Sequence, residues 1–212
     1  MQPFSPDEID EFLRHGTSTL CEAAALPCAL DHALRPVWPG AALAGTAFPL
    51  RCAPGDNLAI HYAVAEAGKG DVLVVDAAQY IGGYWGEVLT AAAEERGIAG
   101  LVIDGGVRDI AALERRKFPV FARGVGMRGC VKLHAPSVGE TIVIAGVTVA
   151  RGDLVVADAD GVLSIPRTQV ARTLAAARQR TDKEASMMQR LAQGETTLQI
   201  LGLADRGHGR KS

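Results

Sequence analysis

The sequence predicts a single α/β domain with a mixed sheet. Two short apolar runs rich in β-branched residues, Asp71–Asp76 and Ile98–Ile103, are typical of strands covered on both faces. Segments with helical periodicity precede them, at Asn57–Ala67 and Glu87–Glu95. Beyond Gly124 the pattern changes to closely spaced short strands separated by turns. Helices that alternate with strands and then give way to hairpins indicate an α/β protein.

The composition indicates a globular protein without the charge of a nucleic-acid binder. The 212 residues are 48% hydrophobic, which is enough for a substantial core and excludes disorder of the whole chain. No break argues for two domains, so we expect one domain over residues 1–203 and a flexible polar tail over 204–212. The net charge is −2 and the pI is about 6.2, so no nucleic-acid partner is expected.

Membrane and export signals are not apparent in the sequence. No apolar run approaches the ~20 residues of a membrane helix, and the acidic start MQPFSPDEIDEF contains no apolar signal region. The four cysteines have no CxxC spacing and no paired histidines, so neither a zinc site nor a disulfide framework is indicated: Cys21, Cys28, Cys52 and Cys130. We therefore expect a soluble, cytoplasmic protein with reduced thiols and no membrane partner.

Helix-capping signals mark the start of the chain. Ser5-Pro6-Asp7-Glu8 combines an N-cap serine, a proline at the first helical position and a glutamate three residues later, which predicts a short helix to about Leu13. Thr19–Glu22 repeats the capping pattern and predicts a second short helix through Ala25. Three prolines make the next segment irregular: Pro27, Pro36 and Pro39.

A strand and a helix follow. We expect the strand over Gly45–Arg51, before a turn at Pro54-Gly55-Asp56. Asp56 is placed to cap the helix Asn57–Ala67, and Gly68 is a typical C-terminal signal for it.

The stretch Gly82–Asp109 contains a glycine-rich loop, a helix, a buried strand and a second glycine turn. Gly105-Gly106 is expected to end the strand and deliver Arg108 and Asp109 into the following corner. Corners between strands and helices are where α/β proteins tend to bind ligands. The candidate site is therefore at this corner.

After Gly82–Asp109 we expect a short helix over Asp109–Arg116, a short strand over Pro119–Phe121, and a long charged helix from Arg167 to about Gln193.

Four more strands are expected between that short strand and the long helix, with turns at Ala145-Gly146 and Asp158–Gly161. They are Thr141–Ile144, Val147–Val149, Leu154–Ala157 and Gly161–Ile165.

Arg108 and Asp109 are the first candidate functional residues. Arginine offers a planar fork to a carboxylate, and an aspartate next to it offers oxygen ligands to a hard cation. The alternative is structural, with Asp109 as a helix N-cap and Arg108 solvated. The position of the pair after a buried strand and a glycine corner favours a functional role.

Glu87 follows Gly86 at a predicted helix start, where the helix dipole favours a carboxylate for purely structural reasons as well. Twenty residues lie between Glu87 and Arg108, about one helix plus one strand, so both residues can face one pocket. The backbone amides of Gly86–Val88 are placed to hold an anionic oxygen.

Other polar residues carry weaker signals. Asp76 and Asp104 end apolar strands and either support the site or are simply strand-terminal polar groups. Lys132 lies among apolar residues, but nothing else supports a Schiff-base lysine, whose activity would survive EDTA. The five histidines have no metal-ligand spacing and are assigned no role.

Several of these motifs together resemble the RraA-like family. The resemblance rests on Trp85-Gly86-Glu87 with the run Arg96–Asp109, and on Pro54–Leu58, Gly70–Asp76 and Gly152–Asp158. That family includes aldolases for 4-hydroxy-4-methyl-2-oxoglutarate and 4-carboxy-4-hydroxy-2-oxoadipate, which also decarboxylate oxaloacetate, and the regulator of RNase E activity. The resemblance implies a compact α/β/α domain related to the phosphohistidine swivelling domain. It also implies homotrimers or homohexamers with sites between subunits.

The resemblance assigns roles to individual residues. Arg108 would hold the pyruvate carboxylate of a 2-oxo acid, Asp109 would bind a divalent metal such as Mg²⁺ or Mn²⁺, and Glu87 would work with a water in proton transfer. Many family members have Asp where this chain has Glu87. A carboxylate from the C-terminal helix of a neighbouring subunit would complete the metal shell, with Glu184 as the best match and Glu195 as the alternative.

Two other functions are alternatives to a lyase. A protein-binding regulator resembling the RNase E inhibitor needs no catalysis, although it can keep the same three residues. A methyltransferase is disfavoured because no glycine-rich S-adenosylmethionine loop follows the first strand.

Overall fold

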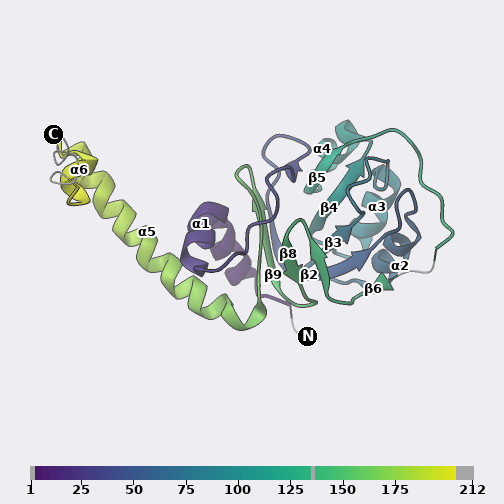
Figure 1. Cartoon of the computed structure of the whole chain (residues 1–212), viewed down its shortest axis with the longest axis horizontal. Helices are drawn as coiled ribbons and strands as arrows, with labels where there is room; N and C mark the ends of the chain where they lie inside the picture. The colour runs from purple at the N-terminus through teal and green to yellow at the C-terminus, as the bar shows by residue number, and fades with distance from the viewer. Residues whose placement is uncertain (1–2, 135–136, 204–212) are drawn as a thin grey trace, which may run out of the picture.

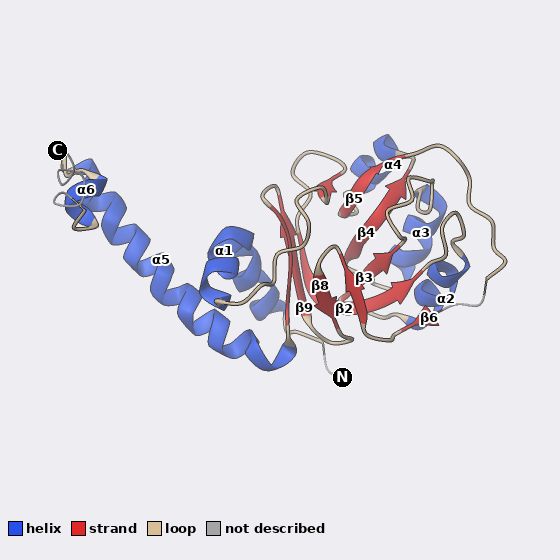
Figure 2. Ribbon diagram, viewed as in Figure 1, coloured by secondary structure: helices blue, strands red, loops and turns tan. Residues whose placement is uncertain are grey.

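The computed structural model describes residues 3–134 and 137–203 (Figure 1). It confirms a single α/β domain with a mixed sheet, and strands and helices alternate along the chain as expected (Figure 2). The predicted tail over 204–212 lies outside the described residues.

An eight-stranded sheet forms the centre of the domain. Its order is β1-β5-β4-β3-β2-β9-β10, with β6 paired to β2; β2 to β5 are parallel, and β9 and β10 are antiparallel. The bounds are β1 Arg35–Pro36, β2 Leu43–Arg51, β3 Asp71–Asp76, β4 Gly100–Val107, β5 Val120–Val125, β6 Ser137–Val138, β9 Leu154–Asp158 and β10 Gly161–Ile165. A separate hairpin consists of β7 Ile142–Ile144 and β8 Val147–Val149.

Helices cover the sheet in two groups (Figure 2). The first group lies beside the parallel strands and comprises α2 Leu58–Glu66, α3 Glu87–Glu95 and α4 Ile110–Arg116. The second group lies beyond β9 and comprises α1 Pro6–Ala24 and α5 Val170–Ala192, preceded by the 3₁₀ turn Arg167–Gln169 and followed by α6 Thr197–Ile200. The second half of α5 extends away from the body of the domain (Figure 1).

The domain has two hydrophobic cores, one on each face of the sheet. Neighbouring residues of β9 alternate between them: Val155 packs with the α2–α4 side, whereas Val156 packs with α1 and α5. Val162 and Leu163 of β10 alternate in the same way. Because successive side chains of a strand point to opposite faces, a strand that is apolar throughout is covered on both. The arrangement is the α/β/α architecture that the family resemblance implied.

The first two predicted helices are one broken helix. α1 runs from Pro6 to Ala24, and only Gly16 has non-helical angles, with φ 73°. The predicted start is confirmed, since Ser5 and Glu8 form a capping box. The predicted break between two helices is confirmed, but it is confined to Gly16 and does not extend from Leu13 to Thr19. A single glycine in the left-handed region breaks the helix, and the hydroxyl and N–H of Thr17 then bond the carboxylate of Asp158.

The prediction that Gly105-Gly106 ends its strand is also wrong. β4 continues to Val107, with a register shift between Ile103 and Gly106. A Cβ on Gly106 would lie 2.5 Å from the carbonyl oxygen of Gly82, so this glycine allows close approach of the 80–84 loop. The loop and strand are joined by a hydrogen bond of 3.2 Å from Tyr84 N to Gly106 O. The strand therefore delivers Arg108 directly to the site.

The remaining differences are at short elements and ends. The strand predicted over Pro119–Phe121 is longer, since β5 extends to Val125, and the long helix begins with a 3₁₀ turn at Arg167. β1, β6 and α6 are two to four residues long and had no periodic signal to predict them.

Asp56 anchors a loop to the start of α2. Its carboxylate is 2% exposed and accepts hydrogen bonds from Leu58 N at 2.8 Å and Leu133 N at 2.6 Å. His134 adds its backbone N–H and its Nδ1, each 3.0 Å from the same oxygen as Leu133. Burial opposes the charged form, but these hydrogen bonds outweigh it and hold the pKa of Asp56 well below its usual 3.8. Asp56 thus bonds the first residue of α2 and anchors the loop, but the N-cap position itself belongs to Asn57, one residue later than predicted.

The low pKa of Asp56 predicts a pH-dependent contribution to stability. A depressed folded-state pKa stabilises the fold above the unfolded pKa, and this contribution is lost as pH falls toward the folded one. We expect Asp56→Asn to lower the free energy of unfolding by about 2–3 kcal/mol at pH 7 and by about 1 kcal/mol less at pH 3, which lies below the unfolded pKa but above the folded one. Urea unfolding at both pH values measures this, with the exposed Asp10→Asn as control. An equal loss at pH 3 and pH 7 would contradict the linkage.

Candidate active site

A pocket of about 310 Å³ lies at the end of β4, beside the first turns of α2 and α3. Its walls come from α2, the 83–86 loop, α3, the end of β4 and the loop after β5: Asn57, His61, Gly83, Tyr84, Gly86, Val88, Leu89, Arg108, Asp109 and Lys132. Four of the predicted site residues line it, namely Gly86, Val88, Arg108 and Asp109. The position is the predicted strand-to-helix corner.

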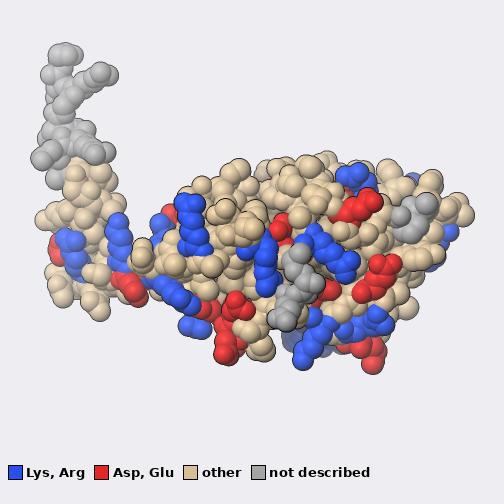
Figure 3. Space-filling view, turned by 90° about the horizontal axis from the view of Figure 1, so that it is seen from below, with Lys and Arg blue, Asp and Glu red and all other residues tan. Residues whose placement is uncertain are grey.

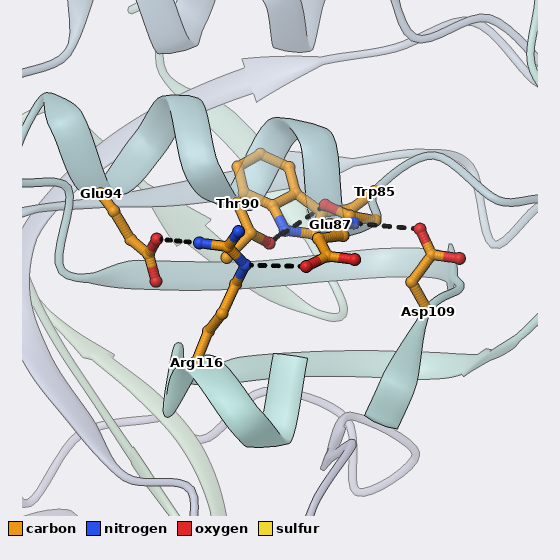
Figure 4. Close-up of polar contacts among 7 residues, drawn as sticks. Trp85, Glu87, Thr90, Glu94, Asp109 and Arg116 are labelled. Atoms are coloured by element: carbon orange, nitrogen blue, oxygen red, sulfur yellow. Dashed lines mark hydrogen bonds and ion pairs between the residues drawn. The ribbon is translucent and has the colours of Figure 1, made fainter. Parts of the chain in front are cut away.

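Asp109 occupies the N-cap position of α4 but does not cap it. Its backbone is in the left-handed region, with φ 62°, and its side chain makes no cap hydrogen bond. Instead, Oδ2 accepts the backbone N–H of Glu87 at 3.0 Å (Figure 4). The purely structural explanation of Asp109 as a cap is therefore wrong. An aspartate held in a sparsely populated conformation beside a pocket suggests a functional constraint.

Arg108 is fixed at its backbone and half exposed at its side chain. Its N–H donates to the carbonyl of Trp85 at 2.9 Å, while the side chain is 49% exposed. The Nε atom lies 4.0 Å from Oδ2 of Asp109. A Cβ on Gly83 would lie 2.9 Å from Cδ of Arg108, so the glycine leaves room for this side chain. The guanidinium is thus available to an anion entering the pocket.

Glu87 is the first residue of α3, and its carboxylate points to Arg116 of α4 (Figure 4). Glu87 Oε1 lies 3.2 Å from Arg116 Nε, and Arg116 Nη1 also bonds Glu94 at 2.7 Å. These two carboxylates raise the pKa of Arg116. The backbone N–H of Glu87 thus bonds Asp109, but the side chain of Glu87 is not among those that line the pocket.

The backbone amides of Gly86–Val88, which were predicted to hold an anionic oxygen, are partly bonded within the chain. The amide of Glu87 is bonded to Asp109, which leaves Gly86 and Val88 to offer N–H groups. A Cβ on Gly86 would overlap the Asp109 carboxylate, so this glycine is required for the close approach of α3 and Asp109.

Two aromatic residues hold the 83–86 loop from behind. Trp85 is fully buried, stacks on Phe118 with centroids 5.9 Å apart, and bonds Thr90 through Nε1 at 2.7 Å. The hydroxyl of Tyr84 accepts the N–H of Gly55 at 2.6 Å and donates to the carbonyl of Ala53 at 3.1 Å. Trp85 therefore belongs to the core, whereas Tyr84 also lines the pocket.

Asp76 and Asp104 form ion pairs outside the pocket. Asp76 bonds Arg51 at 3.0 Å, and Asp104, which is 3% exposed, bonds Arg123. Neither aspartate lines the pocket, so neither supports the site directly; Asp76 ends β3 as a strand-terminal polar group, whereas Asp104 lies inside β4.

Sequence reasoning missed three pocket residues: Asn57, His61 and Lys132. Asn57 and His61 are four positions apart, a spacing that places them on one side of a helix and was available as a signal. Burial lowers the pKa of His61, and the charge of Lys132 lowers it further. Lys132 carried only the weak signal of its apolar neighbours, because the path of the loop after β5 is what brings it to the pocket.

The carboxylate oxygens of Asp109 suit a hard cation such as Mg²⁺. The described part of one chain brings few other metal ligands close to them. Within residues 3–134 and 137–203, no three His, Cys, Asp or Glu side chains converge as a metal site. Glu184 lies on α5 and pairs with Arg180 at 2.9 Å, and Glu195 pairs with Arg190 through both oxygens. A single chain therefore does not bring either glutamate to Asp109. The predicted contribution from a neighbouring subunit stays a prediction.

The surface and the helices add two observations. On the face seen in Figure 3, Lys and Arg side chains are interspersed with Asp and Glu rather than gathered in one basic area. No helix in the described part of the chain combines the length and apolar character that crossing a membrane requires.

Comparisons with known proteins identify the family of this chain. The family model RraA-like (Aldolase/RraA) matches residues 17–164. A protein of Halalkalibacterium halodurans, provisionally named a 4-hydroxy-4-methyl-2-oxoglutarate aldolase, is 35% identical over 181 residues, which cover 84% of this chain and 86% of that one.

Solved structures show the same fold. An uncharacterised protein from Pseudomonas syringae is 27% identical with a TM-score of 0.81, covering 94% of this chain and 99% of the other. The RNA-processing inhibitor RraA from Thermus is 30% identical with a TM-score of 0.60, covering 65% of this chain and 84% of the other. The chain belongs to the RraA-like family.

Proposed function

We propose that this chain is a divalent-metal-dependent lyase of the cytoplasm. It cleaves 4-hydroxy-2-oxo diacids, such as 4-hydroxy-4-methyl-2-oxoglutarate and 4-carboxy-4-hydroxy-2-oxoadipate, to pyruvate and a second 2-oxo acid. It also decarboxylates oxaloacetate, because that reaction passes through the same pyruvate enolate. The observation that supports this most is the pairing of Arg108 and Asp109 at the pocket, with Asp109 drawn away from its capping role.

Asp109 would hold the cation, Mg²⁺ or Mn²⁺, with waters, substrate oxygens and Glu184 of a neighbouring subunit as the other ligands. Magnesium keeps several waters in proteins, so one carboxylate per chain is compatible with its binding. When bound, the cation supplies Lewis-acid stabilisation of negative charge on the keto oxygen. We propose homotrimers or homohexamers, as the family resemblance implies, so that Glu184 of a neighbouring subunit can reach the cation.

Residues of the chain itself bind the substrate and transfer the proton. Arg108 binds the carboxylate of the 2-oxo acid and offsets the negative charge that grows as the carbon–carbon bond breaks. Glu87 takes the proton of the 4-hydroxyl through a water, and Arg116, 3.2 Å from its carboxylate, fixes where that carboxylate lies. Decarboxylation of oxaloacetate involves no such hydroxyl and does not need this proton transfer.

Lys132 is placed to recognise the second carboxylate of a diacid. It lines the same pocket as Arg108 and lowers the pKa of His61 through its charge. We expect Lys132→Met to raise KM for 4-hydroxy-4-methyl-2-oxoglutarate about tenfold with a smaller change in kcat. Steady-state kinetics measure this, with the exposed Lys69→Met, outside the pocket, as control. A fall in kcat alone would assign Lys132 to the chemical step instead.

The direct test of the function is pyruvate release. EDTA-stripped protein is assayed with oxaloacetate and with 4-hydroxy-4-methyl-2-oxoglutarate, with and without Mg²⁺. Turnover that Mg²⁺ restores is the expected result. Activity that survives EDTA and is trapped by borohydride would instead indicate a Schiff-base lysine. No turnover of either compound at saturating metal would overturn the lyase.

A second candidate function is a protein-binding regulator of RNA processing. Its support is the likeness to the Thermus inhibitor, which is 30% identical to this chain. Substitution of Arg108 separates the two functions. A lyase loses turnover, whereas an inhibitor that acts through its surface keeps its effect on the ribonuclease.

A further inference from the structure

Cys21 and Cys28 place two free thiols in contact on the face of the sheet that α1 and α5 cover. Their sulfur atoms are 4.0 Å apart. Cys28 belongs to the core on that face, and Cys21 packs against it. A disulfide has an S–S bond of about 2.05 Å, so the two sulfurs would have to approach by about 2 Å. An approach of this size is within the reach of side-chain rotation.

The two cysteines lie on segments that the fold holds next to each other. Cys21 is in the last turn of α1, which ends at Ala24. Cys28 lies beside β10, where its carbonyl accepts the N–H of Ser164 at 2.9 Å. A bond between the two sulfurs would therefore tie the end of α1 to β10 through the short loop that connects them.

The two thiols differ in their exposure. Cys21 is partly exposed and lines a pocket of about 250 Å³ together with Thr17, Ser18 and Asp160. Cys28 is fully buried, and this burial, together with the charge of a Cys21 thiolate, raises the pKa of Cys28 to about 12. A small oxidant in the pocket therefore reaches Cys21 first, whereas Cys28 is shielded until its neighbour has reacted.

We propose that Cys21 and Cys28 form a reversible disulfide when the protein meets a peroxide. The Cys21 thiolate attacks one oxygen of hydrogen peroxide, the O–O bond breaks, and the released hydroxide takes up a proton to become water. The sulfenic acid at Cys21 is neutral, so it no longer opposes ionisation of Cys28. The sulfur of Cys28 then attacks the sulfur of Cys21, and the sulfenic hydroxyl leaves as water with the proton of Cys28. Two thiols are oxidised and one peroxide is reduced.

The test maps the bond by mass spectrometry of the full chain. Trypsin cleaves after lysine and arginine but not before proline, so residues 15–51 form one peptide that contains Cys21 and Cys28 but neither Cys52 nor Cys130. After treatment with hydrogen peroxide, this peptide is expected to lose two hydrogen atoms and both of its sites for alkylation by iodoacetamide. Dithiothreitol should restore both sites. A peptide that keeps two alkylatable thiols under excess peroxide would overturn the proposal.

Single substitutions test the order of the two steps. In Cys28→Ala the sulfenic acid of Cys21 has no partner, so dimedone should label Cys21. In Cys21→Ala, Cys28 should stay reduced because it is buried. Cys130→Ala removes the other partly exposed thiol and should leave the bond in the 15–51 peptide unchanged. Oxidation of Cys28 in the Cys21→Ala protein would overturn the assignment of Cys21 as the first thiol to react.

The bond is also expected to stabilise the fold. Closing the loop from Cys21 to Cys28 in the unfolded chain predicts a rise in Tm of about 5 °C. Thermal unfolding before and after peroxide measures this rise, and the double variant Cys21→Ala/Cys28→Ala, treated in the same way, controls for oxidation elsewhere. An equal Tm in the oxidised and reduced wild-type protein would mean that the bond does not fasten α1 to β10. Neither cysteine lines the pocket of Arg108, so these outcomes do not depend on the proposed lyase function.

Discussion

Arg108→Ala is expected to lower kcat/KM for both substrates by about 10²–10³-fold, the loss typical of a donor that stabilises developing negative charge. Both reactions place a 2-oxo carboxylate and a growing enolate charge in the pocket that Arg108 lines, so both should fall together. The fold should be preserved, because the side chain is 49% exposed and the backbone N–H bond to Trp85 remains. Steady-state kinetics with saturating Mg²⁺ measure the loss, and urea unfolding checks the fold.

Two further variants make the Arg108 test specific. Arg115→Ala removes the same charge from an exposed position on α4 and should leave kcat/KM nearly unchanged. Arg108→Lys keeps the charge but lacks the planar fork, so it should restore only part of the activity. Equal losses in Arg108→Ala and Arg115→Ala would mean that the general charge of this face matters, not a contact with the substrate.

The sequence was most informative where a physical signal is local. The buried strand Asp71–Asp76 was predicted with its observed bounds because β-branched residues between polar ends have few alternatives. The predicted helix Glu87–Glu95 likewise matches α3. The corner that holds Arg108 and Asp109 followed from this helix and the strand predicted over Ile98–Ile103, since a helix plus a strand returns the chain to the same sheet edge.

What sequence reasoning missed depends on contacts between distant segments. Gly106 resembled a strand terminator, yet it is glycine because the 80–84 loop passes against β4. Asp109 resembled an N-cap, and only the packing of α3 beside α4 shows that its carboxylate bonds Glu87 instead. Lys132 reaches the pocket because Asp56 anchors the end of its loop, through Leu133 and His134. No spacing within the sequence encodes these approaches.

Asp109→Asn is expected to abolish the response to metal. The amide keeps the size of the side chain and an oxygen for the N–H of Glu87, but it loses the charge that a hard cation requires. Loss of a residue that merely orients a metal ligand costs about 10–100-fold in affinity, so loss of the ligand itself should exceed this. Mg²⁺ titration of pyruvate release measures the shift. Asp104→Asn, whose carboxylate bonds Arg123 instead, should keep the wild-type metal response even if it lowers stability.

Mixing two inactive variants then tests where the remaining ligand comes from. Glu184 is on α5, whose second half extends away from the body of its own chain, so a role at the metal requires a neighbouring subunit (Figure 1). If each site combines Asp109 of one subunit with Glu184 of the next, Asp109→Asn and Glu184→Gln are both inactive alone. Co-refolded at equal amounts into a cyclic assembly, they should regain about a quarter of the wild-type sites, because one random pairing in four unites both intact residues. Recovery with Glu195→Gln in place of Glu184→Gln would transfer the role to Glu195. An active Glu184→Gln protein, or no recovery in either mixture, would mean that the metal is held within one subunit, and Asp109 would then need waters and substrate alone to complete its shell.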